Sequence, residues 1–273
     1  MDILRTIGSE RSYTFHSHTQ YCDGKATASE MACAAVAAGF RYYGFSPHSP
    51  VPIESPCNMP AGSVDAYLAE VEDVRRDPAL ASCRFFAGME VDYLGPEWGP
   101  SHDYFHSLPL DFTIGSVHFI PNQDGIYVDV DGHFDNFKMK MERYFHNDID
   151  YVVRTFYRQS TEMILAGGFD ILGHLDKVGQ NASYFSPGIE DTPMYRSLVG
   201  DLIDLVIDRG LLIELNTKAL AEHGRFFPGK RYLERLVRGG VPVIVNSDAH
   251  RTDTLQAGRA EGFALLDSIA GKL

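Results

Sequence analysis

The chain has 273 residues, of which 44% are hydrophobic and 22% are charged, as in an ordinary soluble globular protein. Its 24 lysines and arginines against 37 aspartates and glutamates give a formal net charge of −13, with no basic run anywhere. Phosphate-backbone contacts need clustered cations, so nucleic acid is disfavoured as a partner, and no window approaches the roughly 20 apolar residues that cross a bilayer.

The bulk properties also indicate where the protein works. Residues 1–11 are charged and lack the apolar stretch of a signal peptide, and the four cysteines form no C-x-x-C pair. Both features favour a cytoplasmic protein with free thiols. A chain of this length fits one α/β barrel, and no linker or repeat interrupts it, so we expect a single domain over residues 1–273.

Seven short apolar, β-branched or aromatic runs are predicted strands, at residues 12–15, 42–46, 84–89, 112–117, 170–173, 211–215 and 243–246. Several of them, such as 211–215, do not alternate, which is typical of strands buried on both faces. Helical patterns lie between them, at residues 30–38 (capped by Ser29), 63–74, 148–165, 195–207, 232–237 and 255–269. This alternation predicts parallel βα units.

Three stretches interrupt the strand–helix pattern. Residues 47–60 hold five prolines, and residues 95–110 and 121–133 are rich in Gly, Pro, Asp and His. We expect all three to be loops. The last two follow strands that end in candidate ligands, so we expect them to form the rim or lid of a site.

The first candidate ligands follow the first predicted strand. His16 and His18 are two residues apart, and in an extended chain such residues point to the same side, so both imidazoles can bind one ion. The H-x-H pattern alone fits a pair of core or surface histidines equally well. Asp23, before Gly24, can add an oxygen ligand, although Asp-Gly turns are common without one.

Later strands end in the same residue types. His48 lies in a loop, where a single histidine is usually only polar surface. Glu90 ends an apolar strand, where a carboxylate is costly to bury unless it is paired or coordinated, and a carboxylate can bridge two ions. Asp92 and Asp176 can orient neighbouring ligand histidines. The other ligands predicted at strand ends are His118, His174, Asp248 and His250.

Nine candidate ligands exceed the needs of one tetrahedral ion. They fit two or three divalent ions of Zn, Fe or Mn that share Glu90 as a bridge. Ions roughly 3.5–4 Å apart can clamp the attacking and leaving oxygens of a phosphoryl displacement. A parallel barrel gathers its strand ends on one face, so the sequence predicts a metal-dependent hydrolase with its ions in one barrel mouth. Cys22 can add a ligand, but a small filler side chain fits that position better.

The order of these motifs resembles the PHP (polymerase and histidinol phosphatase) superfamily over nearly the whole chain. The most specific pieces are His16-Ser17-His18, Gly173-His174-Leu175-Asp176 and Ser247-Asp248-Ala249-His250. The resemblance implies an α/β fold, a distorted (β/α)7 barrel with three metal ions at the C-terminal ends of its strands. It further implies one ion held by His16, His18, Glu90 and Asp248, a second by Glu90, His118 and His174, and a third by Asp23, His48 and His250.

Within the superfamily the sequence is most similar to monofunctional histidinol-phosphate phosphatases. The similarity rests on Glu90-Val91-Asp92-Tyr93, on residues 114–120 and on Ile213-Glu214-Leu215-Asn216-Thr217. It implies hydrolysis of L-histidinol phosphate to L-histidinol and phosphate, a step of histidine biosynthesis, by a metal-bridging hydroxide. Lys218 departs from the pattern, because a small residue is expected there.

The resemblance also suggests roles in catalysis and substrate binding. Glu90, Asp248 and His250 are the expected catalytic residues, and the acid that protonates the leaving group is Asp248, His250 or a metal-bound water. Arginine binds phosphate in bidentate fashion, and Arg158 and Arg196 are candidate phosphate clamps because both precede strands that end in the site. Each alone fits a surface helix slightly better. Glu214 or other rim acids are expected to receive the ammonium group of the substrate.

Other functions compete with this hypothesis. The chain can be a PHP phosphoesterase for another small phosphate ester, such as a nucleotide or sugar phosphate. A polymerase-associated nuclease is disfavoured by the net charge of −13. A non-catalytic binding module is disfavoured because every ligand type is present, and a structural zinc protein because such sites favour cysteine.

Overall fold

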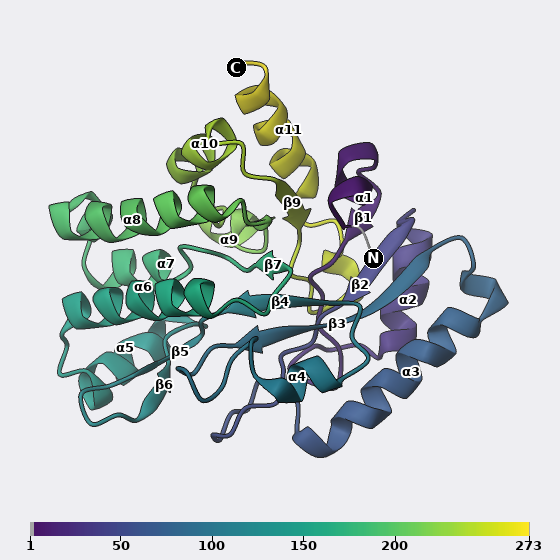
Figure 1. Ribbon diagram of the computed structural model, residues 1–273, viewed down its shortest axis with the longest axis horizontal. Coiled ribbons are helices and arrows are strands. Elements are labelled where there is room, and N and C mark those ends of the chain that lie inside the picture. Colours follow the sequence, from purple (N-terminus) through teal and green to yellow (C-terminus); the bar gives the residue numbers. More distant parts are fainter. Residues whose placement is uncertain (1–2, 273) are drawn as a thin grey trace.

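The computed structural model describes residues 3–272. Its centre is a parallel sheet of seven strands in the order β1–β2–β3–β4–β7–β8–β9 (Figure 1). The strands are β1 (Tyr13–Thr14), β2 (Tyr42–Phe45), β3 (Arg84–Asp92), β4 (Phe112–Ser116), β7 (Ile171–Leu172), β8 (Ile213–Asn216) and β9 (Val243–Asn246). The outer strands β1 and β9 approach each other where Ser17 bridges Ala249, so the sheet is nearly closed. The predicted seven-stranded barrel is confirmed.

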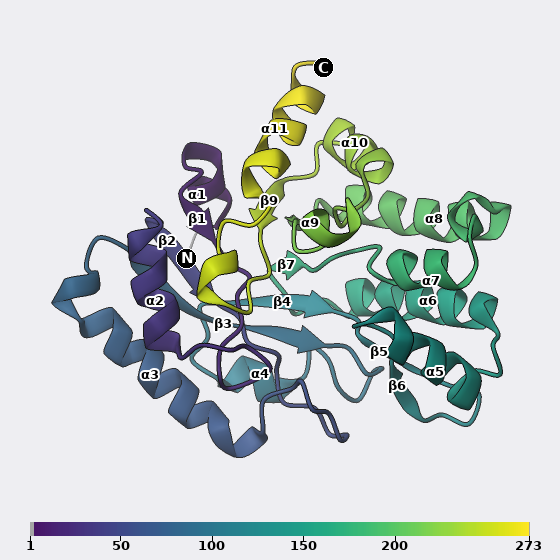
Figure 2. The ribbon, with the colours of Figure 1, turned by 180° about the vertical axis from the view of Figure 1, so that it is seen from behind.

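Helices surround the sheet, as the front and rear views show (Figures 1 and 2). They are α1 (Ile3–Ser9), α2 (Ala28–Ala37), α3 (Val64–Arg76), α4 (Asp103–Ser107), α5 (Phe134–Tyr144), α6 (Ile149–Ala166), α7 (Val178–Phe185), α8 (Pro193–Arg209), α9 (Leu220–His223), α10 (Lys230–Arg238) and α11 (Arg259–Ala270). Each of the six helices predicted from the sequence overlaps one of these, with shifts at the ends.

The start of α2 differs from the prediction. Thr27, not Ser29, caps the helix: its side chain accepts a hydrogen bond from the backbone N–H of Glu30, and the Glu30 side chain accepts one from the backbone N–H of Thr27. This capping box satisfies two N–H groups at once, which Ser29 cannot do. The hydroxyl and backbone N–H of Ser29 instead donate to Glu70 of α3.

The expected rim loops contain regular structure. Residues 95–110 include α4, and residues 119–129 form an antiparallel hairpin of β5 (Phe119–Pro121) and β6 (Tyr127–Asp129). In this hairpin Asn122 orders the turn, because its side-chain oxygen accepts from the backbone N–H groups of Asp124 and Ile126. Residues 47–60 contain neither a helix nor a named strand, as their prolines predicted.

Alternation along the strands positions the site above the barrel interior. On β3, Phe86 belongs to an interior cluster to which Tyr13, Phe112, Ile114, Ile171 and Ile244 also contribute. Ala87, Met89 and Val91 instead pack outward against α2 and α3. Successive strand residues face opposite sides, so Gly88 and Glu90 share the inward face with Phe86. The carboxylate of Glu90 therefore lies one layer above an apolar floor.

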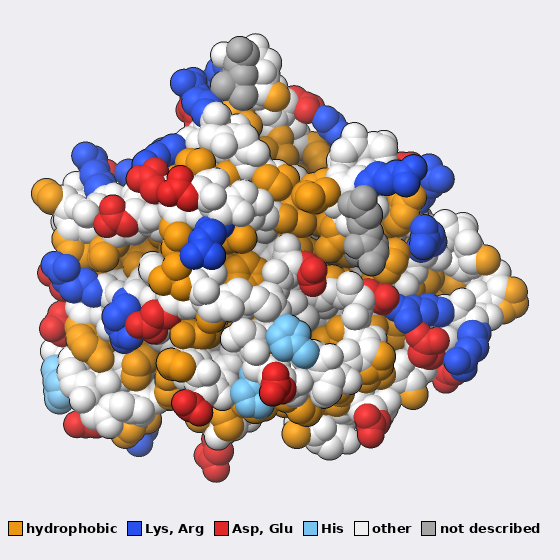
Figure 3. All heavy atoms as spheres, viewed as in Figure 1, with side chains coloured by type: hydrophobic (Ala, Val, Ile, Leu, Met, Phe, Trp, Pro, Cys, Tyr) orange, Lys and Arg blue, Asp and Glu red, His pale blue; other side chains and the backbone are white. Residues whose placement is uncertain are grey.

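The molecular surface carries no continuous basic patch on the face that Figure 3 shows, as the absence of a basic run in the sequence predicted. Basic and acidic side chains are interspersed on this face. Within residues 3–272, no helix has both the length and the apolarity needed to cross a membrane.

Candidate metal centre

The structure brings all nine predicted ligands together at the C-terminal ends of the strands. Seven of them are buried, whereas Asp23 and His250 are partly exposed, which marks the side of the cluster that faces solvent. The nine come from segments far apart in the sequence: His16, His18 and Asp23 after β1, His48 after β2, Glu90 on β3, His118 after β4, His174 after β7, and Asp248 and His250 after β9.

Glu90 lies at the centre of the cluster. Its Oε2 atom is 3.2 Å from His16 Nε2, 3.6 Å from His18 Nε2 and 3.0 Å from His48 Nδ1. Its Oε1 atom is 2.9 Å from His174 Nε2 and 3.4 Å from His118 Nε2, and it accepts a 2.7 Å hydrogen bond from Ser116 Oγ. A carboxylate between five imidazoles has the geometry expected of a bridging ligand.

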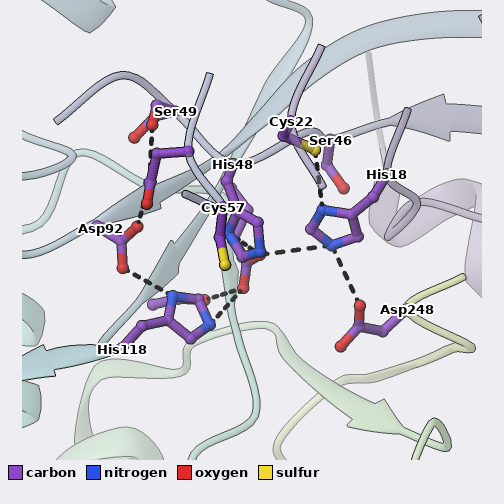
Figure 4. A network of polar contacts seen from close by, with 12 residues as sticks. His18, Cys22, Ser46, His48, Ser49, Cys57, Asp92, His118 and Asp248 are labelled. Carbon is purple, nitrogen blue, oxygen red and sulfur yellow. Dashed lines mark hydrogen bonds and ion pairs between the residues drawn. The ribbon is translucent and has the colours of Figure 1, made fainter. Parts of the chain in front are cut away.

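Asp248 forms a second focus. Its Oδ1 atom is 3.1 Å from His18 Nε2, a contact drawn in Figure 4. The same oxygen is 3.8 Å from His16 Nε2. Its backbone adopts a φ of +50°, in the left-handed region that Asp tolerates better than most residues. The other carboxylate oxygen accepts a 3.1 Å hydrogen bond from Asn216 Nδ2 of β8.

A third group lies toward solvent. Asp23 Oδ1 is 3.3 Å from His250 Nε2 and 3.8 Å from both His48 Nε2 and His18 Nδ1. Cys22 contacts the same cluster, with Sγ 3.5 Å from His18 Nδ1. Burial, assisted by the charge of Asp23, raises the pKa of Cys22 to about 12, so it remains a neutral thiol and fits the filler role.

Two buried acids orient ligand histidines from behind. Asp92 Oδ1 is 2.7 Å from His118 Nδ1, as the sequence predicted and as Figure 4 shows. Glu214 Oε2 is 2.8 Å from His16 Nδ1, and Glu214 Oε1 accepts from the backbone N–H of His174 at 2.9 Å. Acids that accept the Nδ1 proton leave the Nε2 lone pair directed at the cluster, which is how such partners fix metal-ligand histidines.

The position of Glu214 corrects the expectation that it receives the substrate from the rim. Its side chain is fully buried on the inward face of β8. Two further amides, Asn216 Nδ2 and Asn246 Nδ2, donate to it at 3.0 and 3.2 Å. With its oxygens engaged in this way, Glu214 positions His16 and does not meet an incoming ammonium group.

The carboxylates of the cluster are held in the anionic form, whereas its imidazoles differ in how readily they are protonated. Burial opposes ionisation of Glu90, but His16, His118 and His48 outweigh it and hold its pKa well below the usual range. Burial likewise opposes ionisation of Asp248, but Lys218 and His16 outweigh it and hold the pKa of Asp248 well below its usual range. Burial lowers the pKa of His18, and the neighbouring His250 and His48 lower it further. Anionic carboxylates beside neutral imidazoles are the form in which these groups bind metal.

The donor set fits divalent metal ions. Ligand atoms within 4.8 Å of one another form three groups: His18, Asp23, His48 and His250; His16, His18 and Asp248; and His48, Glu90 and His118. Five buried atoms in these groups have no hydrogen-bond partner, namely His16 Nε2, His18 Nε2, Asp23 Oδ1, His48 Nδ1 and Glu90 Oε2. Buried polar atoms are rarely left unpaired, and coordination of cations would satisfy all five at once.

Three other predicted residues lie in different surroundings. Arg158 forms an ion pair with Glu162 on the exposed side of α6, and Arg196 pairs with Asp191 at the start of α8. These arginine contacts lie outside the cluster and give a phosphate clamp no support. Asp176 does not orient His174 as expected, because its Oδ2 accepts from Arg225 Nη2 at 3.3 Å and from the Gly229 N–H at 3.0 Å.

The sequence analysis assigned no role to the two cationic side chains beside the cluster. Lys218 Nζ lies 3.2 Å from Asp248 Oδ1, and Lys177 Nζ lies 3.2 Å from Asp131 Oδ2. Lys218 lies two residues after β8 and Lys177 five residues after β7, so both are in the loops that follow strand ends, as the ligands are. From the sequence, Lys218 stood out only as a departure from the family pattern, and Lys177 carried no signal because lysine is not a usual metal ligand.

The PHP domain model matches residues 14–218. No curated protein matches the sequence significantly. A solved structure assigned as the histidinol phosphatase HisK of Listeria monocytogenes superposes with a TM-score of 0.79 at 18% identity, covering 91% of this chain and 99% of that one. A second solved structure is histidinol phosphate phosphatase HisK of Lactococcus lactis, in complex with Zn, L-histidinol and phosphate. It superposes with a TM-score of 0.69 at 16% identity, covering 94% of this chain and 93% of that one.

Proposed function

Because the chain belongs to the PHP domain family, whose model covers residues 14–218, we propose that it is a metal-dependent phosphomonoester hydrolase. The observation that carries the proposal is Glu90, a buried carboxylate within 3.6 Å of five imidazole nitrogens at the mouth of a parallel barrel. Such a donor set holds two or three ions of the Zn, Fe or Mn type. We propose that residues 1–273 act as one catalytic domain.

In this proposal the chain's own side chains orient the residues that would bind the metal ions. Asp92 and Glu214 accept the Nδ1 protons of His118 and His16, which keeps both Nε2 lone pairs available. Ser116 donates to Glu90 Oε1 and limits rotation of the bridging carboxylate. When bound, the metal ions supply an activated water and neutralise charge that develops on phosphorus oxygens. The partly exposed Asp23 and His250 lie where a substrate would approach.

We further propose that the substrate is L-histidinol phosphate. Support comes from the Lactococcus lactis structure with L-histidinol and phosphate, whose fold this chain shares over nearly its full length. A partly exposed acid, Asp131, lies near the mouth and is a candidate to meet an ammonium group in place of the buried Glu214. The alternative is another small phosphate ester.

A substrate panel tests both levels of the proposal. Protein reconstituted with Zn²⁺ or Mn²⁺ is assayed for phosphate release from L-histidinol phosphate, a nucleoside monophosphate, a sugar phosphate and glycerol phosphate. We expect turnover of L-histidinol phosphate far above the others. Similar slow rates on all four would contradict the substrate, and no rate on any would contradict the hydrolase.

The variant His118→Ala serves as the control for the site. It removes a side chain that contacts Glu90 and His174, so we expect kcat to fall by roughly 10²-fold or more while the protein stays folded. Circular dichroism and the unfolding midpoint report on the fold. An unchanged kcat in this variant would contradict the ligand assignment.

A further inference from the structure

Two lysine ammonium groups lie at the mouth of the metal centre. Lys218, directly after β8, places Nζ 3.2 Å from Asp248 Oδ1 and 3.3 Å from His250 Nε2. Lys177, at the start of α7 and three residues after His174, places Nζ 3.2 Å from Asp131 Oδ2. Each of the two ammonium groups interacts electrostatically with both Asp131 and Asp248, so both lie close to the acids of this mouth.

The two lysines differ in how firmly they are held. The side chain of Lys177 is only 11% exposed, and its ammonium lies 5.3 Å from the ring centre of Phe227 in addition to its pairing with Asp131. The side chain of Lys218 is 41% exposed. Lys177 is therefore a fixed cation at the inner side of the mouth, whereas Lys218 is free to swing away from Asp248 toward solvent.

Cations beside a cation-binding site require an explanation. An ammonium group 3.2 Å from a ligand oxygen would repel divalent ions held by that oxygen, with little screening at a partly buried position. An anion between the lysines and the ions removes this repulsion, because it attracts both. A phosphate monoester carries such an anion, with several oxygens to share between the two sides.

We propose that Lys177 and Lys218 form the phosphate subsite of this enzyme, the role that sequence analysis expected of Arg158 and Arg196. This inference rests on the proposed function. The lysines bind the phosphate oxygens that point away from the ions. They orient the phosphate group for in-line attack, and they also bind the inorganic phosphate that the reaction releases. The chain thus recognises phosphate by two point charges, not by a planar bidentate guanidinium.

Binding of inorganic phosphate tests the inference without turnover. The Zn²⁺-loaded wild type, Lys177→Met and Lys218→Met are titrated with inorganic phosphate by calorimetry, and metal content is measured by elemental analysis. Charge-assisted hydrogen bonds predict a roughly 10-fold or larger rise in Kd for each variant, with KM for the ester rising in parallel. Metal content should not fall, because each variant removes a repelling cation. Lys218→Arg should keep Kd within a few-fold of the wild type.

Lys140→Met is the matched control. Lys140 is another lysine near this rim, but its ammonium pairs with Asp129 at 2.6 Å and belongs to neither group at the mouth. We expect phosphate binding like that of the wild type.

Three results would overturn the inference. If both methionine variants bind phosphate as the wild type does, the lysines are not the subsite, and continued ester hydrolysis would leave the hydrolase proposal standing. If the variants lose metal, the lysines support the structure of the centre instead. If the wild type neither binds phosphate nor hydrolyses any ester, the proposed function fails together with the inference.

Discussion

At the residue scale, the same residue type serves different purposes according to what it touches. Glu90 is surrounded by five imidazoles that converge from four strand ends, whereas Glu214 lies on β8 and bonds to the back of one of them. Both are acids on buried strands of the barrel, Glu90 near the end of β3 and Glu214 within β8. The sequence could predict that position, but not which nitrogen each oxygen would face, because that depends on strand order and register.

Glu214→Gln separates the two roles considered for Glu214. The amide cannot accept the Nδ1 proton of His16 as strongly as the carboxylate, so we expect metal affinity to fall about 10- to 100-fold. The measurement is competition with a chelator of known affinity. KM ratios between L-histidinol phosphate and glycerol phosphate should stay constant. A selective rise in KM for the aminated substrate, with unchanged metal affinity, would restore the ammonium-binding role.

Metal binding should release protons at mildly alkaline pH. Burial disfavours the charged form of His118, but Asp92 and Glu90 outweigh it and raise its pKa to about 10 in the metal-free chain. His118 is then protonated at pH 8 and must lose one proton before Nε2 can bind an ion. Below about pH 10 the raised pKa keeps His118 protonated, and the proton competes with the metal ion. Apparent metal affinity should therefore increase as the pH rises toward that value.

Calorimetry in two buffers of different ionisation enthalpy measures this release. At pH 8 we expect at least one proton per chain for the wild type and fewer for His118→Gln. Identical binding enthalpies in both buffers would argue against a protonated His118.

At the scale of elements, close packing inside the barrel fixes the height of Glu90. A methyl group at Gly88 would overlap the ring of Phe112, and one at Gly44 would lie 2.6 Å from the same ring. Strands β2, β3 and β4 therefore approach closely around Phe112, one layer beneath the carboxylate. The glycines are part of what positions the metal centre.

Gly88→Ala should destabilise the protein by about 1–3 kcal/mol, because an extra methyl in a packed core forces side chains or backbone to shift. Urea unfolding measures the change, and adding Phe112→Leu should recover part of it. Gly62→Ala is the control, since a methyl there meets nothing within 4 Å. Equal midpoints for Gly88→Ala and the wild type would show that this layer tolerates a shift.

The elements that the sequence predicted well are those with strong apolar patterns. All seven strands were identified, because strands buried on both faces are apolar throughout. The short hairpin β5–β6 and helix α7 were missed, since elements of three to eight residues repeat their period too few times for a pattern to stand out. Helix α5 did carry a signal, as Phe137 and Met141 are four residues apart and both buried, but its many charged residues obscured the pattern.

At the scale of the whole molecule, the metal centre spans the seam where the barrel closes. The backbone pairing across this seam is short: just beyond β1 and β9, the Ser17–Ala249 bridge has hydrogen bonds of 2.8 and 3.4 Å. His16 and His18 lie on one side of this seam, and Asp248 and His250 lie on the other. Ions shared across the seam would join the first and last strands, which no local sequence pattern could predict.

Removal of the ions should therefore loosen the seam first. After chelation we expect hydrogen exchange to accelerate most in residues 13–19 and 244–250, with smaller changes in β3 and β4, because the seam has few backbone hydrogen bonds of its own. Mass spectrometry of peptides from these regions gives the comparison. A uniform increase over the whole chain, or none at the seam, would contradict this role.

The central claim is that nine side chains from six strand ends gather a cluster of divalent ions. Anomalous X-ray diffraction at the absorption edge of the bound metal tests it most directly, on crystals of protein supplied with Zn²⁺ or Mn²⁺. We expect two or three anomalous peaks beside Glu90, each about 2.0–2.2 Å from nitrogen or oxygen atoms of these residues. Crystals in which these side chains surround no anomalous peak would contradict it.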